Sequence, residues 1–341
     1  MFAVVRRSAG CRAGLALLVL TLVALTAQAC NIPVFRYALE RWRPDVSQFI
    51  VFHRGPLTAE HQGQIDQFRQ RAEVVGANAQ VTLVDLAQAP ARDTAAAHSQ
   101  ERALWQQLSS QANPTLELPY LLVRLPHTRG LLNAWHGPLT PTLQAALVES
   151  PVRSELTRRL LLGDAIVWLL IRSPDEERNA PVRKLLTEQC RELSSTIVLP
   201  EGIGLPGSEL FSEVPLLLRF SVIEIDRGDV REQFLLNVFE NFQPAAFDRG
   251  EPLLVPVFGR GRALEVIPAE DVSSNLIADL TAFLSGACSC QVKEQNPGFD
   301  LLLSANWDAE LFGEDAPLPP PAKSIGQGDR GPVLLTIPPG R

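Results

Sequence analysis

Cys288-Ser289-Cys290 places two thiols one residue apart, a spacing that could support thiol-disulfide exchange or bind a soft metal ion. The pair follows an apolar helical pattern that Gly286 is expected to end. The C-terminal end of a helix carries the negative end of its dipole, which disfavours a thiolate there. The position of the pair therefore argues against a cysteine nucleophile.

Cys30 and Cys190 leave three interpretations open. The cysteines form a structural disulfide involving Cys190 or Cys30, stay as unpaired thiols, or carry a redox or metal function through Cys288 and Cys290. Cys190 shares a helical face with Leu186 and Leu193, which predicts a small buried apolar residue.

The histidines give no metal-binding pattern. None is spaced three or four residues from another ligand on one predicted helix, so we predict no metal site and no cofactor. The histidines are His53, His61, His98, His127 and His136.

Two similar segments begin with histidine: His53-Arg54-Gly55-Pro56-Leu57-Thr58 and His136-Gly137-Pro138-Leu139-Thr140. One interpretation is two turns that lead into helices, with Thr58 and Thr140 as N-caps. The alternative is that His53 and Arg54 line a ligand groove beside Pro119.

The segment 202–207 matches the glycine spacing of a dinucleotide-binding turn. It is not followed by a helix of sufficient length, because Pro215 comes soon after and Pro206 lies within the turn. We predict a loop. The chain has none of the common hydrolase or phosphate-binding motifs.

Apolar periodicity predicts the same order of elements twice, strand-helix-strand-helix-strand-strand-helix. The first copy has predicted strands at 49–52, 81–84, 120–123 and 132–135, and a final helix through Leu143, Leu147, Leu156 and Leu160. The second copy has predicted strands at 165–170, 216–225, 253–257 and 263–267 and a final helix through Leu276, Leu280 and Phe283. Each third strand follows a proline, Pro119 or Pro252.

This order resembles the thioredoxin fold and implies an α/β protein with two tandem thioredoxin-like βαβαββα domains and mixed sheets. The resemblance implies a cis proline at Pro119 and Pro252, beside the active site. Cysteines are missing from both active-site positions, so it implies redox-inactive domains of the kind that bind other proteins. The segment 30–42 resembles the opening of an uncharacterised family of exported bacterial proteins, which implies no activity.

The predicted organisation is a signal peptide (1–29), a first domain (30–163), a second domain with a Cys-x-Cys extension (164–315) and a disordered Pro/Gly-rich tail (316–341). We expect a helix at 34–42 to pack Phe35, Leu39 and Trp42 onto the first domain.

Arg6, Arg7 and Arg12 precede the uncharged run 15–27, which is typical of an export signal. We expect a periplasmic or extracellular protein, membrane-anchored if Cys30 is lipidated. The formal net charge of −7 argues against nucleic acid as a partner.

We therefore predict a non-catalytic binding or scaffolding protein whose partner is an unidentified protein or peptide. The alternatives are a thiol-disulfide or metal-handling protein that uses Cys288 and Cys290, and a lipidated envelope spacer.

Overall fold

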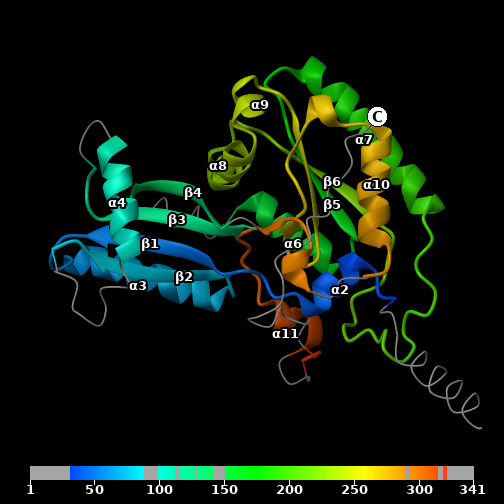
Figure 1. Ribbon diagram of the computed structural model, residues 1–341, viewed down its shortest axis with the longest axis horizontal. Coiled ribbons are helices and arrows are strands. Elements are labelled where there is room, and N and C mark those ends of the chain that lie inside the picture. The colour runs from blue at the N-terminus through cyan, green and yellow to red at the C-terminus, as the bar shows by residue number, and fades with distance from the viewer. Residues whose placement is uncertain are drawn as a thin grey trace, which may run out of the picture.

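The computed structural model describes residues 31–87, 99–111, 116–127, 130–140, 150–288, 292–313 and 318–320. These residues form a mixed α/β protein with two mixed sheets (Figure 1). The predicted fold class, α/β with mixed sheets, is confirmed at this level. Across the described ranges, no helix combines the length and apolar character needed to cross a bilayer.

The first sheet has the strand order β2-β1-β3-β4. Strand β1 is parallel to β2 and antiparallel to β3, and β3 is antiparallel to β4. Helices α3 and α4 follow β1 and β2 in the chain. The bounds are β1 (Ser47–His53), α3 (Ala59–Val74), β2 (Ala79–Asp85), α4 (Ser99–Gln111), β3 (Tyr120–His127) and β4 (Gly130–Pro138).

The second sheet has the same central pairing, with β5 parallel to β6 and antiparallel to β7. Strands β8 and β9 pair one after the other with the free edge of β7, and β10 pairs with β8. The strands are β5 (Ile166–Ile171), β6 (Phe220–Ile225), β7 (Leu253–Phe258), β8 (Arg262–Ala263), β9 (Ile267–Pro268) and β10 (Phe299–Asp300). The helices that follow them are α7 (Glu176–Thr196), α8 (Gln233–Phe242), α9 (Pro244–Asp248) and α10 (Ser274–Ser285).

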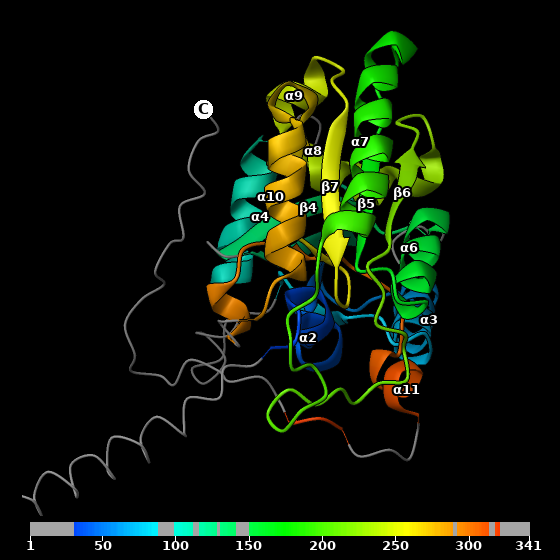
Figure 2. The same cartoon turned by 90° about the vertical axis from the view of Figure 1, so that its right-hand side faces the viewer.

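Strand β5 is buried at every position because helices cover both faces of its sheet. Its odd-numbered residues lie in the core that includes α6 (Pro151–Leu161) and α8. Its even-numbered residues lie in the core that includes α7, α10 and α2 (Val34–Arg41). Figure 2 shows α7 and α10 over one face of the sheet. The continuous apolar run of this strand follows from its two-sided burial.

Two helices lie against the second sheet although the sequence assigned them to the first domain. Phe35 and Trp42 of the α2 segment pack in the core with α7 and α10, and only Leu39 joins the core shared with the first sheet. Leu156 and Leu160 of α6 pack beside β5. The prediction for α2 was wrong because an apolar helix face specifies burial but not the surface that covers it.

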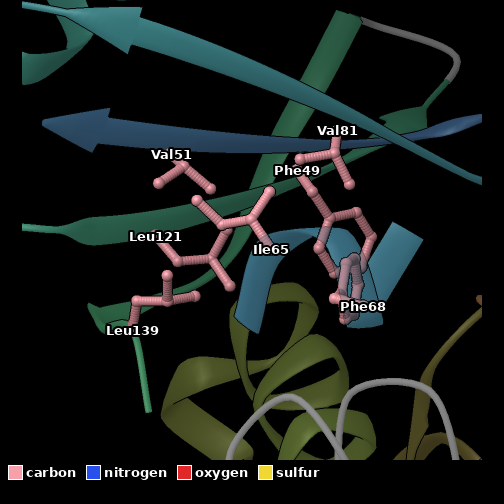
Figure 3. A pocket seen from close by; sticks show the side chains of 7 residues that line it. All are labelled: Phe49, Val51, Ile65, Phe68, Val81, Leu121 and Leu139. Atoms are coloured by element: carbon pink, nitrogen blue, oxygen red, sulfur yellow. The ribbon is translucent and has the colours of Figure 1, made fainter. Parts of the chain in front are cut away.

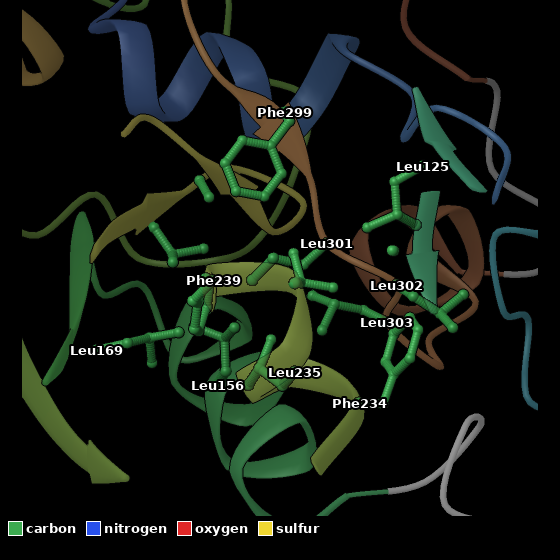
Figure 4. Close-up of a cluster of buried hydrophobic side chains, with 14 of the residues drawn as sticks. Leu125, Leu156, Leu169, Phe234, Leu235, Phe239, Phe299, Leu301, Leu302 and Leu303 are labelled. Atoms are coloured by element: carbon green, nitrogen blue, oxygen red, sulfur yellow. The ribbon is translucent and has the colours of Figure 1, made fainter. Parts of the chain in front are cut away.

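The segment after α10 joins the two sheets. Strand β10 lies beside β3 of the first sheet, and Ser304 forms a bridge with Ala77. Leu301, Leu302 and Leu303 lie among side chains of α6 and α8 (Figure 4). Helix α11 (Trp307–Phe312) ends the segment, and Trp307 and Leu311 are buried. One of the hydrophobic cores is therefore shared by the two sheets.

Two predicted strands differ from the observed ones. The strand expected at 216–225 begins at Phe220, which pairs with Ile166 at the start of β5. The chain before it runs along α2, where the Ser212 and Val214 carbonyls accept hydrogen bonds from Arg36. The strand expected at 263–267 is divided into β8 and β9. The predicted helical positions Leu143 and Leu147 lie outside the described residues, as do residues 1–30 and 321–341.

Candidate functional site: a pocket beside Pro252

The cysteines that the structure describes are buried. Cys190 lies on the inner face of α7, and burial raises the pKa of its thiol to about 12. Cys288 follows α10, is 1% exposed and packs in the same core. Cys30 and Cys290 lie outside the described residues. Within the described ranges, no group of three or more metal-ligating side chains comes together.

The end of β1 carries the first predicted groove. Phe52 pairs with Tyr120, and continuing this register places His53 opposite Pro119, so the structure brings these two residues to one end of the sheet. The Leu118–Pro119 bond is cis, as the resemblance implied. His53 Nδ1 lies 2.8 Å from the Gly55 carbonyl oxygen, and the Asp85 carboxylate accepts the Gly55 N–H at 2.9 Å. Arg54 is exposed.

Local hydrogen bonds thus hold the turn after β1 in place. Thr58 caps α3 by accepting the His61 N–H at 3.2 Å, which confirms the predicted N-cap. This turn fixes the position of His53, whose Nδ1 already interacts with the Gly55 carbonyl oxygen.

A small void lies under the first sheet, between its strands and α3 (Figure 3). Its volume is about 10 Å³ and every residue around it is apolar, so it offers no polar partner to a water or a ligand. The residues are Phe49, Val51, Ile65, Phe68, Val81, Leu121 and Leu139. We assign it to packing.

Polar side chains occupy the corresponding turn after β5. Asn179 is fully buried, accepts the Ser173 N–H at 2.7 Å and donates to the Ser173 carbonyl oxygen at 3.0 Å. Asp175 caps α7 by accepting the Glu177 N–H. The N-terminus of α7 is therefore closed by its own side chains.

Pro252 is buried immediately before β7, across from the end of β5. Among the described peptide bonds only the one before Pro119 is cis, so the cis geometry expected at Pro252 is wrong. The first half of α7 and the segment 269–272 lie on either side of Pro252 and leave an open pocket of about 450 Å³. Its lining residues are Arg178, Pro181, Val182, Leu185, Glu251, Pro252, Ala269, Glu270 and Val272.

The pocket combines an apolar floor with charges of both signs. Arg249 lies beside it and pairs with Glu251 at 2.7 Å and with Glu270 at 3.2 Å. The hydrogen bond from Arg249 lowers the pKa of Glu251, so this carboxylate is ionised at neutral pH. Its second oxygen, Oε2, is buried and has no hydrogen-bond partner among the described residues.

This arrangement suits binding better than covalent catalysis. The lining contains no thiol, hydroxyl or imidazole. The volume lies within the range of ligand pockets, about 300–1,000 Å³. The exposed Glu270 carboxylate can accept a hydrogen bond from a bound N–H group, while Val182, Leu185 and Val272 can contact apolar side chains.

Of the predicted groove residues, Pro252 lines this pocket, while His53, Arg54 and Pro119 belong to the other sheet. The sequence prediction missed Arg178, Leu185, Glu251 and Glu270. The available signal was positional: Glu251 precedes the proline, and Arg178 and Leu185 are on the helix that follows the first strand of the second copy.

Comparison of the chain with models of protein families, with curated proteins and with solved structures finds no match.

Proposed function

We propose that this protein is an exported binding or scaffolding protein built from two tandem, redox-inactive thioredoxin-like domains, and that the pocket beside Pro252 holds an extended segment of a protein partner. The observation that carries the proposal is this open pocket of about 450 Å³, with an apolar floor and the exposed Glu270 carboxylate in its lining.

Strand order supports the thioredoxin-like assignment. In each sheet the first strand lies between a parallel neighbour and an antiparallel one, and in each case the antiparallel strand begins next to a proline. Proteins with this fold hold extended peptides at that end of the sheet.

The state of the described cysteines favours binding over thiol chemistry. Cys190 and Cys288 are buried, and a thiol with a pKa near 12 forms very little thiolate at neutral pH. The helix N-termini after β1 and β5 carry Thr58 and Asp175 as caps, so these positions stabilise helices.

The proposal is tested by selecting random displayed peptides on the full chain and comparing their affinities for two variants. Leu185→Asp puts a charge on the apolar floor, and we expect a loss of about tenfold to a hundredfold in affinity. Thr187→Asp is the matched control, an exposed position on the same helix that does not line the pocket.

Equal affinities for the two variants would contradict the assignment of this pocket. Failure to select any peptide that distinguishes the wild type from Leu185→Asp would do the same.

A further inference from the structure

The loop 197–219 between α7 and β6 lies against the first described residue of the chain. The Asn31 N–H donates to Ser208 Oγ at 2.9 Å. Gly202 passes so close that a Cβ atom there would lie 3.0 Å from Asn31 Nδ2. Residues before Asn31 therefore continue from a point beside this loop.

The loop has a defined conformation. Gly204 N–H donates to the Ser208 carbonyl oxygen and Ser208 N–H donates to the Leu205 carbonyl oxygen, both at 2.8 Å. Gly202, Gly204 and Gly207 have positive φ angles, between 84° and 87°, which only glycine adopts readily. At the other end, the buried Glu40 carboxylate accepts the Phe211 N–H at 3.1 Å.

This ordered loop exposes apolar side chains. Val198 is 85% exposed, Leu205 is 61% exposed and Phe211 is 42% exposed. Leu205 Cδ1 would lie 3.7 Å from a Cβ at Gly202, so Leu205 lies near the same spot as Asn31. Of these three side chains, Leu205 lies beside Asn31, whereas Phe211 packs against the Arg41 guanidinium.

The chain just before Asn31 identifies the partner. The uncharged run 15–27 ends four residues before Asn31, a separation that spans at most about 14 Å in extended chain. A lipid on Cys30, the residue directly before Asn31, would place a bilayer within reach of Leu205.

We propose that the loop 197–211 is a membrane-docking surface, which inserts Leu205 at the interface of a lipid bilayer held beside Asn31. Exposed Glu201 and Glu209 flank the loop tip. Backbone hydrogen bonding at Gly207 lowers the pKa of Glu209, so it is anionic. Docking therefore depends on apolar contact and persists on zwitterionic lipid at high salt.

This docking orients the molecule. The loop precedes the N-terminal end of β6, and α7, which leads to it, is 21 residues long, about 30 Å. The pocket beside Pro252 lies along the first half of α7. The pocket thus opens well away from the bilayer surface, whatever it binds.

The test uses the full chain recovered from the envelope with its own N-terminal processing and placed in phosphatidylcholine vesicles. The photo-crosslinker p-benzoylphenylalanine replaces Leu205 in one variant and Val230 in another. Val230 is a matched control because it is 79% exposed and follows the opposite end of β6.

We expect a phospholipid adduct several-fold stronger from position 205 than from position 230, unchanged in about 0.5 M NaCl. A second variant, Glu209→Gln, keeps the loop length and is expected to retain the adduct. An equal adduct from both positions would overturn the proposal. So would crosslinking of position 205 to another protein or a second copy, or failure of the chain to float with the vesicles.

Discussion

Cys190 faces the core from α7, where Leu186 also lies buried. Burial raises the pKa of this thiol because the interior solvates a thiolate poorly. The sequence prediction of a small buried apolar residue agrees with this position. Cys190 therefore contributes to core packing, and its buried thiol is not exposed to a substrate.

We predict that Cys190 in the native protein resists alkylation at pH 8. With a pKa of about 12, only about one thiol in ten thousand is ionised at that pH. Mass spectrometry of the peptide that contains Cys190 after iodoacetamide treatment measures this, with glutathione as the reference thiol. Denatured protein should react fully, and rapid native modification would contradict the burial argument.

Asp300 is a second buried residue whose pKa is shifted by its surroundings. It is buried at the junction between the sheets, pairs with Arg262 at 3.1 Å and with Lys293, and accepts the Asp45 N–H at 2.6 Å. Burial acts to raise its pKa, but the charges of Lys293 and Arg262 outweigh burial and lower it. The carboxylate therefore stabilises the fold while it is ionised.

We predict that Asp300→Asn lowers the free energy of unfolding by about 3–5 kcal/mol, since it leaves the buried Arg262 without a counter-charge while Lys293 keeps its pair with Asp45. The lowered folded-state pKa means that the wild-type contribution is present above the unfolded pKa of about 3.9 and is lost as pH falls further.

Urea unfolding between about pH 6 and pH 3 measures both effects. The variant should show a shallower loss of stability in acid than the wild type. The control Asp66→Asn breaks an exposed pair with Arg69 and should cost at most about 1 kcal/mol. If the free energy of unfolding depended on pH identically in Asp300→Asn and wild type, ionisation of Asp300 would not be what stabilises the fold in acid.

Helix α2 shows how one element holds another. Arg36 and Glu40 of this helix form a buried ion pair at 2.9 Å. Their remaining polar atoms bind the loop 197–219, where Arg36 donates to the Val214 carbonyl oxygen at 2.7 Å. Glu40 accepts the N–H groups of Phe211 and Ser212. The loop thus depends on a helix about 170 residues away in sequence.

We predict that Glu40→Gln weakens the attachment of the loop and speeds hydrogen exchange at the Phe211 and Ser212 amides. The variant leaves Arg36 without its buried counter-charge, a change that costs about 3–5 kcal/mol. NMR-detected exchange measures the rates. Glu213→Gln, an exposed glutamate of the same loop, should leave them unchanged. Unaltered exchange in Glu40→Gln would mean that the Arg36–Glu40 pair does not order the loop.

The sequence predicted the helices, strands and turns better than the surfaces against which they pack. The apolar run of β5, the Thr58 cap and the loop at 202–207 could be predicted because each is a local pattern. The surface that covers α2 and the shortened strand β6 could not, because distant segments decide them. The trans bond at Pro252 is the ordinary geometry, and the cis expectation came from the resemblance alone. The pocket was missed for the same reason.

At the scale of the whole molecule, the two sheets are held together by the segment after α10. Phe299 of β10 stacks on Phe242 of α8, with ring centroids 4.1 Å apart, and His127 of β3 lies against both rings. Asn78 after α3 donates to the Asp45 and Leu301 carbonyl oxygens. We therefore expect the two sheets to unfold together.

We predict that Phe299→Ala costs about 3–5 kcal/mol and destabilises both sheets together. Hydrogen exchange of peptides from β1 and β5 across a urea series measures this. Both should share one midpoint in wild type and variant. The control Phe283→Ala removes a ring that is 37% exposed and should cost less. Separate midpoints for β1 and β5 would show two independent units.

The central claim is that the pocket beside Pro252 binds an extended segment of a protein partner. Its most direct test is hydrogen exchange of the full chain with and without a peptide selected on it. We expect slower exchange at 178–185, 251–253 and 269–272, the segments that line the pocket. Protection confined to the turn after β1, around His53 and Pro119, or protection nowhere in the described residues, would contradict it.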